Sequence, residues 1–306
     1  MSGPLKSPID AKTRYCAVYG HPIKHSASPA MQNAGISALG LNWRYLAFAV
    51  HPDDLREAIV GAKVMNFIGL NLTVPHKLLA FEMVDELDES AKLCGAVNTI
   101  RFEGLTSSGH WRALREFAEA PRETRSHGFN TDADAITRSL KEDLGFRPGG
   151  SRVLLLGAGG AGRTAALKLA GDGVSELFLV NRTLSKANIV ASEIANRFPE
   201  IKVHLGYPKS GEIDLVLNAT SLGLKSTDSV PFDRTQFRLE RAQRVYDMIY
   251  RPAETPLLKL ARKTGCRTSN GLGMLLYQGA KALEIWTGKK APVELMRKAL
   301  EKNVYG

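Results

Sequence analysis

The fold of this chain is decided by the stretch VLLLGAGGAGR at residues 153–163, in which an apolar run passes directly into closely spaced glycines. Gly157, Gly159 and Gly162 satisfy the pattern GxGxxG, and an amphipathic stretch follows them. A strand, a tight glycine turn and a helix in this order bind the pyrophosphate of a dinucleotide, because the helix N-terminus offers free N–H groups to the anion. The residues expected to line this turn are Gly157, Ala158, Gly159, Gly160 and Ala161.

The tip of the next predicted strand indicates which dinucleotide is bound. Residues 177–180 are followed by Asn181-Arg182-Thr183 and Lys186, and the first acidic residue is Glu193. A carboxylate at this tip would bond the ribose hydroxyls of NAD(H), whereas a guanidinium accommodates the 2′-phosphate of NADP(H). Arg182 therefore favours NADP(H). The alternative is that Arg182 is an ordinary solvated surface cation.

Strand and helix signals alternate on both sides of the glycine turn. Proline or a Ser-Pro pair opens the helices expected after Ser28, Pro52 and Pro75. This rhythm predicts an α/β fold with mostly parallel sheets covered by helices. The expected strands are 15–19, 43–50, 67–72, 96–102, 153–156, 177–180, 203–205, 215–217 and 245–248, and later helices are expected at 131–144, 272–286 and 292–304.

The segment from Glu103 to Gly128 interrupts this rhythm. It is polar and contains scattered glycine, serine and proline, so we expect a long loop or a helical excursion on the surface.

Length and composition limit the class of protein. A chain of 306 residues that is 44% hydrophobic and 24% charged is expected to form about two globular domains. No apolar run reaches the length of a membrane span, and the polar first twelve residues are not expected to be a secretory signal. The three cysteines are far apart, so we expect a reducing, cytoplasmic compartment and no metal site.

The net charge of +10 is spread along the chain rather than gathered in one basic tract. We expect it to attract acidic metabolites, and we expect neither a nucleic acid nor a membrane as partner.

Polar residues follow several predicted strands of the first half, where α/β sheets bind their ligands. Ser26 and Ser28 could clamp a carboxylate, although Ser28 could simply cap a helix. Lys77 follows Asn71 and Thr73, and its spacing alone is compatible with a solvated lysine.

Taken together, these motifs carry a resemblance to a known family. The matching stretches are GHPIKHSASP at 20–29, NLTVPHK at 71–77, GAVNT at 95–99, NTD at 130–132, the turn at 157–163, NRT at 181–183, NATS at 218–221, YDMIY at 246–250 and GLGML at 271–275. In this order they make the chain resemble the shikimate dehydrogenase family over nearly its whole length.

The resemblance implies the NADPH-dependent, reversible reduction of 3-dehydroshikimate to shikimate, on the route to chorismate and the aromatic amino acids. It also implies two domains. A substrate-binding domain would comprise residues 1–130 and be completed by the helices at 271–306. Residues 131–270 would form a Rossmann-like NADP-binding domain, with the active site in the cleft between the two.

The resemblance further implies the roles of individual residues. Lys77 and Asp132 would be the catalytic pair. The substrate would contact Ser26, Ser28, Thr73, Lys77, Asn98, Asp132, Tyr250 and Gln278. Beyond the glycine turn, the cofactor would contact Glu89, Asn181, Arg182, Thr183, Lys186, Thr220, Met248 and Gly271.

Three departures from the family pattern leave the exact substrate open. Gln32 stands where many relatives have histidine, Ala133 replaces the glycine of NTDG, and Lys186 replaces a frequent arginine. One alternative is a dehydrogenase of quinate or a related cyclohexane hydroxy acid. Another is a non-catalytic nucleotide-binding or nucleic-acid-binding protein, against which the presence of both Lys77 and Asp132 argues. A monomer and a homodimer are both compatible with the sequence.

Overall fold

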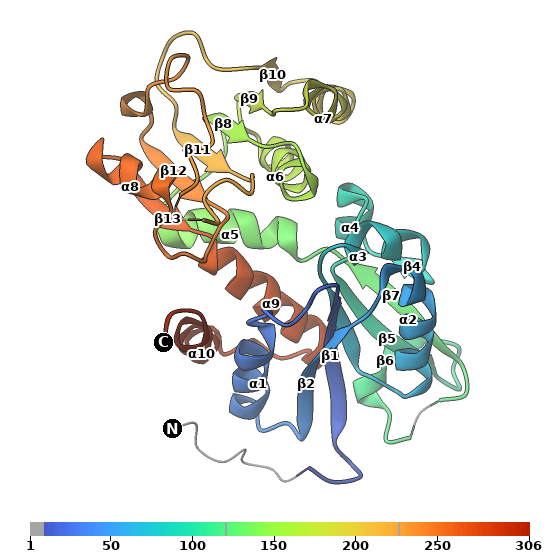
Figure 1. Cartoon of the computed structure of the whole chain (residues 1–306). Helices are drawn as coiled ribbons and strands as arrows, with labels where there is room; N and C mark the ends of the chain where they lie inside the picture. The colour runs from blue at the N-terminus through green and yellow to red at the C-terminus, as the bar shows by residue number, and fades with distance from the viewer. Residues whose placement is uncertain (1–8, 120, 226) are drawn as a thin grey trace. The chain divides into compact units, whose positions relative to one another are not determined.

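The computed structural model describes residues 9–119, 121–225 and 227–306. The chain divides into two compact units, one made of residues up to Asp132 together with Leu276–Gly306, the other of Ala133–Leu275. Each unit is built around its own β-sheet covered by helices (Figure 1). This architecture confirms the predicted α/β fold with mostly parallel pairing.

The sheet of the first unit combines a parallel and an antiparallel part. β1 pairs in parallel with β2 and β3, whereas β5 runs antiparallel to β3, β6 and β7. The strand order is β2-β1-β3-β5-β7-β4, with β6 attached to β5. The bounds are β1 (Arg14–Gly20), β2 (Trp43–Ala49), β3 (Gly69–Leu72), β4 (Glu86–Leu87), β5 (Thr99–Leu105), β6 (Trp111–Ala113) and β7 (Thr124–Phe129).

The prediction of a loop or a helical excursion between Glu103 and Gly128 is wrong. β5 continues to Leu105, and the chain returns through β6 and β7 to pair with it. The pattern misleads because a polar residue is buried in this sheet: Glu103 is only 2% exposed. It forms ion pairs with Arg101 and Arg125 and contacts His127, so the charges of these strands neutralise one another instead of facing water.

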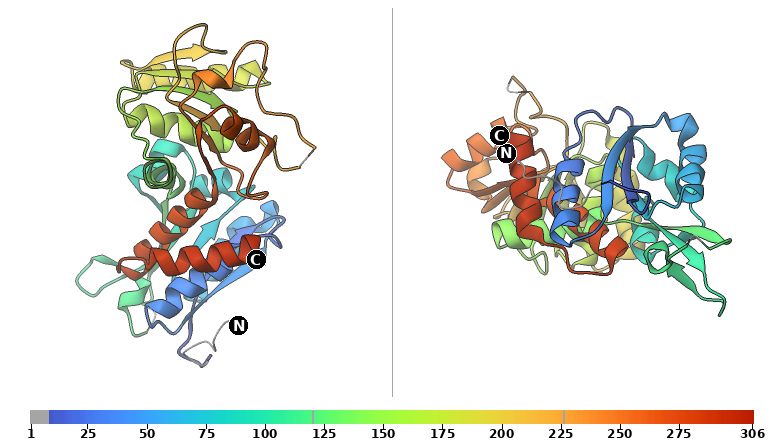
Figure 2. Two further views of the ribbon diagram at one scale, coloured as in Figure 1. Left: turned by 90° about the vertical axis from the view of Figure 1, so that its left-hand side faces the viewer. Right: turned by 90° about the horizontal axis from the view of Figure 1, so that it is seen from below.

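The last helices of the chain complete the first unit. The two predicted terminal helices are confirmed as α9 (Leu272–Thr287) and α10 (Val293–Tyr305). Trp286 of α9 is buried and donates its indole N–H to the carbonyl of Ile100 at 2.9 Å. It covers Gly69, where any side chain would collide with the indole ring. α10 packs alongside α1 (Ser28–Ala38), so both ends of the chain contribute to one core (Figure 2).

Helices in the middle of the first unit are short. The helix expected to run from Pro75 beyond Phe81 is instead a single turn, α3, followed by a 3₁₀ turn at residues 80–82. The remaining bounds are α2 (Leu55–Val64), α3 (His76–Leu79) and α4 (Glu89–Cys94).

The second unit holds a sheet whose ladders are all parallel among the residues described. Its order is β10-β9-β8-β11-β12-β13. The edge strand β13 escaped prediction because its sequence, RTSN, is polar and only half-buried. The bounds are β8 (Arg152–Leu156), β9 (Glu176–Val180), β10 (Lys202–Leu205), β11 (Leu215–Asn218), β12 (Arg244–Asp247) and β13 (Arg267–Asn270).

Both faces of this second sheet are buried, which explains the unbroken apolar run in β8. Val153 and Leu155 face a core with α5, α6 and α7, while Leu154 and Leu156 face a core with α8 and the segment 230–242. β8, which leads into the glycine turn, thereby lies between two packed layers. The helices are α5 (Asp132–Leu144), α6 (Gly160–Gly171), α7 (Leu184–Arg197) and α8 (Pro256–Lys263).

Three further findings concern the described part of the chain. Cys16, Cys94 and Cys266 are buried and form no disulfide with a described residue. No helix there has the length and apolar character needed to cross a membrane. Within the same residues, no three side chains of the types that ligate metals gather in a group that could hold a metal ion.

Candidate functional site

The first unit brings two predicted catalytic side chains into direct contact. Lys77 of α3 donates from Nζ to Oδ2 of Asp132, the first residue of α5, at 2.6 Å. The side chain of Asp132 is 12% exposed and that of Lys77 is 32% exposed. The pair is therefore sheltered yet open on the lysine side, as a group that exchanges a proton with a ligand requires.

Backbone contacts fix both members of this pair to the segment that precedes β5. The carbonyl of Lys77 accepts from the N–H of Val97 at 2.8 Å. The side chain of Asn130 accepts from the N–H of Asp132 at 3.1 Å and donates to the carbonyl of Ala96 at 3.1 Å. The main chains of Lys77 and Asp132 are thus held to one segment, which keeps their side chains within reach of each other.

A buried chain of polar groups continues from this segment into the sheet. Asn98 accepts the N–H of Thr131 at 2.8 Å and the hydroxyl of Thr99 at 3.1 Å. Asn71 donates to the hydroxyl of Thr99 at 3.0 Å and accepts the hydroxyl of Tyr45 at 2.7 Å. Fully satisfied networks of this kind hold polar groups rigidly in a core. Tyr45 was missed by sequence reasoning, because nothing distinguishes it from any other strand tyrosine.

The two serines after β1 lie close together. The hydroxyl oxygen of Ser26 accepts the N–H of Ser28 at 3.4 Å. Ser28 is buried within the first turn of α1 and does not cap it: the capping position belongs to Ala27, and no side-chain cap is formed. The capping interpretation of Ser28 is therefore wrong, because the helix starts one residue earlier than its Ser-Pro signal indicates.

Three other predicted residues of the first unit are placed as follows. The N–H of Thr73 donates to the carbonyl of Tyr19 at 3.0 Å, which holds the turn that leads to Lys77. Gln278 lies in α9. Glu89 begins α4, is largely exposed and forms an ion pair with Lys92 at 2.8 Å.

The glycine turn of the second unit has the shape that its sequence predicts. Gly157 has a φ of +104°, which favours glycine, and a side chain at Gly162 would collide with the carbonyl of Gly157. Side chains added at Gly159 or Gly160 would meet no atom within 4 Å. α6 starts there without a side-chain cap, so its first N–H groups face open space.

The tip of β9 lies against this turn. Asn181 accepts the N–H of Ala158 at 3.0 Å and donates to the carbonyl of Thr183 at 2.7 Å. Arg182 and Lys186 are exposed and form no ion pair with any described residue.

The first acidic residue after this tip is already neutralised. Glu193 is paired with Arg163 at 2.7 Å and with Arg197 at 3.2 Å. The exposed charges next to the glycine turn are therefore positive.

The remaining predicted residues follow the carboxyl ends of β11, β12 and β13. Thr220 donates from its N–H and its hydroxyl to Asn218, at 3.0 and 2.8 Å. Gly271 approaches the carbonyl of Met248 so closely that no side chain would fit there. Tyr250 also belongs to this unit, and burial raises the pKa of its hydroxyl.

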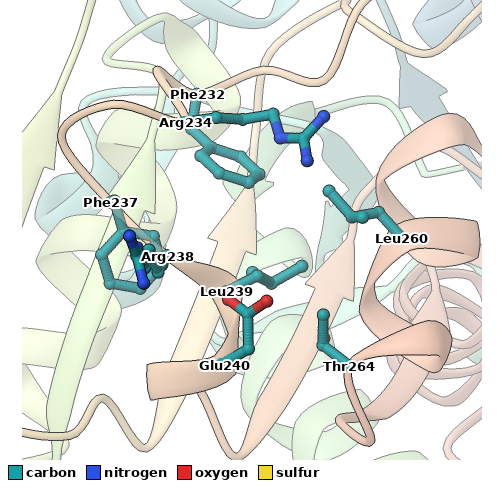
Figure 3. A pocket seen from close by; sticks show the side chains of 8 residues that line it. All are labelled: Phe232, Arg234, Phe237, Arg238, Leu239, Glu240, Leu260 and Thr264. Carbon is teal, nitrogen blue, oxygen red and sulfur yellow. The ribbon is translucent and has the colours of Figure 1, made fainter.

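A pocket of about 180 Å³ lies elsewhere in the second unit, between the segment 232–240 and α8 (Figure 3). It contains none of the predicted site residues. Its lining is Phe232, Arg234, Phe237, Arg238, Leu239, Glu240, Leu260 and Thr264.

Three family models match separate parts of the chain. The shikimate dehydrogenase substrate binding domain matches residues 18–100, the shikimate / quinate 5-dehydrogenase model matches residues 141–225, and the shikimate 5′-dehydrogenase C-terminal domain matches residues 271–301.

Individual proteins are similar over nearly their whole length. A shikimate dehydrogenase (NADP(+)) of Methanopyrus kandleri is 40% identical over 298 residues, covering 95% of this chain and 96% of that protein. A crystal structure of a shikimate dehydrogenase in complex with NADP+ superposes with a TM-score of 0.84 at 36% identity, covering 99% of this chain and 100% of that one. The structure of the Thermus thermophilus enzyme in complex with NADP(H) and shikimate superposes with a TM-score of 0.78 at 32% identity. The match covers 95% of this chain and 99% of that one. The chain belongs to the shikimate dehydrogenase family.

Proposed function

We propose that this protein is an NADP-dependent shikimate dehydrogenase, which reversibly reduces 3-dehydroshikimate to shikimate. The observation that carries the proposal is the 2.6 Å contact between Lys77 and Asp132, because it joins the two groups that this alcohol–ketone chemistry needs. Membership of the family and the relatives that bind NADP+ and shikimate support the same activity.

The residues of the second unit fit the cofactor. The open space beside Gly159 and Gly160 leaves room for a pyrophosphate at the start of α6. Arg182 and Lys186 would hold the 2′-phosphate, Asn181 and Thr183 would shape the adenosine end, and Thr220, Met248 and Gly271 would line the other end. When bound, NADP(H) supplies or accepts the hydride.

The chemical task of Lys77 is to move a proton at the substrate oxygen. During reduction, negative charge grows on the carbonyl oxygen, and the Lys77 ammonium stabilises that charge and donates a proton. In the oxidative direction, the neutral amine accepts the proton of the alcohol. Asp132 keeps Nζ in place for this transfer.

The substrate carboxylate and hydroxyls are assigned to the polar residues that follow the strands. Ser26 and Ser28 would bind the carboxylate, since the hydroxyl of Ser26 lies against the backbone of Ser28 at the start of α1. Thr73, Asn98, Asp132, Tyr250 and Gln278 would contact the ring hydroxyls or the carboxylate. In this proposal residues 1–130 and 271–306 form the substrate-binding domain, and residues 131–270 form the cofactor-binding domain. Glu89 would be an additional contact of the cofactor.

The proposal extends to the setting of the enzyme. A reducing cytoplasm suits three buried cysteines that form no disulfide with a described residue. The partners are small molecules, and the enzyme acts as a monomer or a homodimer.

An absorbance assay at the nicotinamide band tests the function. Shikimate and quinate are each supplied with NADP+ and with NAD+, and we expect the highest kcat/KM for shikimate with NADP+. A higher kcat/KM for quinate than for shikimate would show that quinate is the substrate instead. No oxidation of either acid would overturn it.

A further inference from the structure

A fully buried carboxylate lies under the proposed cofactor site and has no part in the chemistry described above. Asp247, the last residue of β12, is 0% exposed. It accepts hydrogen bonds from the side chain of Asn218 at 2.9 Å, the N–H of Ile249 at 3.1 Å and the hydroxyl of Thr255 at 2.6 Å. It forms no ion pair with any described residue, and burial raises its pKa. Burying a carboxylate costs free energy unless hydrogen bonds compensate for the lost water. The three groups that donate to Asp247 are therefore needed in place.

The first of these contacts sets the orientation of Asn218. An asparagine amide has a donor side and an acceptor side, and a carboxylate can only face the donor side. With its NH₂ group turned to Asp247, Asn218 presents its oxygen to the N–H and hydroxyl of Thr220. The hydroxyl of Thr220 then accepts the N–H of Leu222 at 3.1 Å. The shape of the loop after β11 therefore depends on Asp247.

This loop and the segment after β12 both lie against the proposed cofactor site. A side chain at Gly157 would come within 3.0 Å of Ala219 and of Thr220, so the loop closes one side of the glycine turn. The segment after β12 begins with Met248, whose carbonyl touches Gly271. Asp247 thus holds the two segments that carry Thr220 and Met248.

The third contact ties the same carboxylate to a helix. Thr255 donates its hydroxyl to Asp247, and its oxygen accepts the N–H of Leu258 at 3.3 Å, which caps α8. The loop after β12 is thereby pinned at both ends, at Ile249 and at Thr255.

We propose that Asp247 is a positioning residue for NADP(H), which it holds indirectly by fixing Thr220 and Met248. The inference rests on the proposed function, because it takes those two residues as cofactor contacts. It adds to that function a buried carboxylate that contacts neither the substrate nor the cofactor and yet controls the affinity for NADP(H).

The variant Asp247→Asn tests this role. Its amide would offer an N–H group either to Asn218 or to Thr255, so it loses either the contact that orients the loop after β11 or the contact that ties the loop after β12 to α8. We expect the Kd of NADP+, measured by titration calorimetry, to rise roughly tenfold or more, as for loss of a charged hydrogen bond. KM for NADP+ should rise in parallel. The Kd of shikimate should rise less than that of NADP+, because Tyr250 is the one proposed substrate contact that lies in the second unit.

Asp214→Asn provides a matched control. Asp214 precedes β11 at the opposite end of the same sheet and accepts the N–H of Arg152 at 2.8 Å. The same chemical change there should leave the Kd of NADP+ unaltered, even if it lowers Tm.

Thr255 offers a second, milder test in case Asp247→Asn does not fold. Thr255→Ser keeps the hydroxyl and should bind NADP+ like the wild type. Thr255→Val removes the hydroxyl that donates to Asp247 and should raise the Kd of NADP+ several-fold.

The outcomes separate the inference from the proposed function. Wild-type protein that binds no NADP+ would overturn both. Wild-type binding together with an unchanged NADP+ affinity in folded Asp247→Asn, or in Thr255→Val if the former is unfolded, would overturn the role of Asp247 alone.

Discussion

At the scale of single residues, the proposed function makes the exposed cation Arg182 responsible for the choice between the two nicotinamide cofactors. Replacing it with alanine removes the bidentate partner of the 2′-phosphate, so Arg182→Ala should lose roughly 1.5–3 kcal/mol of preference for NADP+ over NAD+. The ratio of kcat/KM values for the two cofactors measures this loss. Arg234→Ala, an exposed arginine in the pocket of Figure 3, serves as control. An unchanged ratio in Arg182→Ala would remove Arg182 from the site.

His76, the neighbour of Lys77, makes the stability of the protein depend on pH. It is fully buried, and neither ring nitrogen has a hydrogen-bond partner among the residues that the structure describes. Burial, with the nearby His21 and His51, lowers its pKa below the ordinary 6.5. Below that pH the unfolded chain binds a proton that the folded chain refuses, so the free energy of unfolding should fall as the solution is acidified.

Denaturant unfolding at pH 7.5 and pH 5.5 measures this effect. His76→Phe should lose less stability between the two pH values than the wild type, while the exposed His110→Gln should behave like the wild type. An equal loss in His76→Phe would show that another group is responsible.

At the scale of elements, β5 and β7 are held together by the charges around Glu103. Burial opposes ionisation of this carboxyl, but hydrogen bonds from His127, Arg101 and Arg125 outweigh it and lower its pKa to about 2. The stabilisation is therefore complete above the ordinary value of 4.5 and is lost as the pH falls from there toward 2. Glu103→Gln should cost about 3 kcal/mol at pH 7.

Denaturant unfolding at pH 7 checks this value. Glu116, which pairs with Arg112 and Arg115 at the surface, gives the control, since Glu116→Gln should cost less than about 1 kcal/mol. Equal costs for the two variants would contradict a special role of Glu103.

The same elements show what could be predicted from the sequence. The apolar run 153–156 and its glycines predict β8, the turn and α6, because both faces of that strand are buried and only glycine fits at Gly157 and Gly162. The strands between 103 and 128 escaped prediction because the buried Glu103 of β5 pairs with Arg125 and His127 of β7. The edge strand β13 escaped it because its sequence is polar and only half-buried. Long-range charge pairing leaves no local periodicity.

At the scale of the whole molecule, each of the two units carries a different part of the proposed reaction. The contact of Lys77 with Asp132 spans 55 residues, and the first unit is closed only by helices from the end of the chain. These relations became visible only in the fold. In the sequence, only the family resemblance indicates that Lys77 and Asp132 form a pair. Their spacing along the chain does not predict the contact.

Ligand binding provides a prediction at this scale. The glycine turn, Arg182 and Lys186 all belong to the second unit, so NADP+ should stabilise that unit against unfolding. At a concentration one hundred times its Kd, NADP+ should add about 2.7 kcal/mol. A thermal scan with NADP+ and with NAD+ at equal concentration measures this, and the larger shift should come from NADP+. Equal shifts would contradict the assignment of a 2′-phosphate site.

The most direct test of the account is the turnover of Lys77→Ala with shikimate and NADP+, compared with wild type and with Lys63→Ala, a lysine paired with Asp85 away from this contact. Loss of the group that accepts the proton of the alcohol should lower kcat by about 10²–10⁴-fold while the Kd of NADP+ stays unchanged. A kcat near the wild-type value in Lys77→Ala would contradict the claim that Lys77 moves this proton while Asp132 holds it in place.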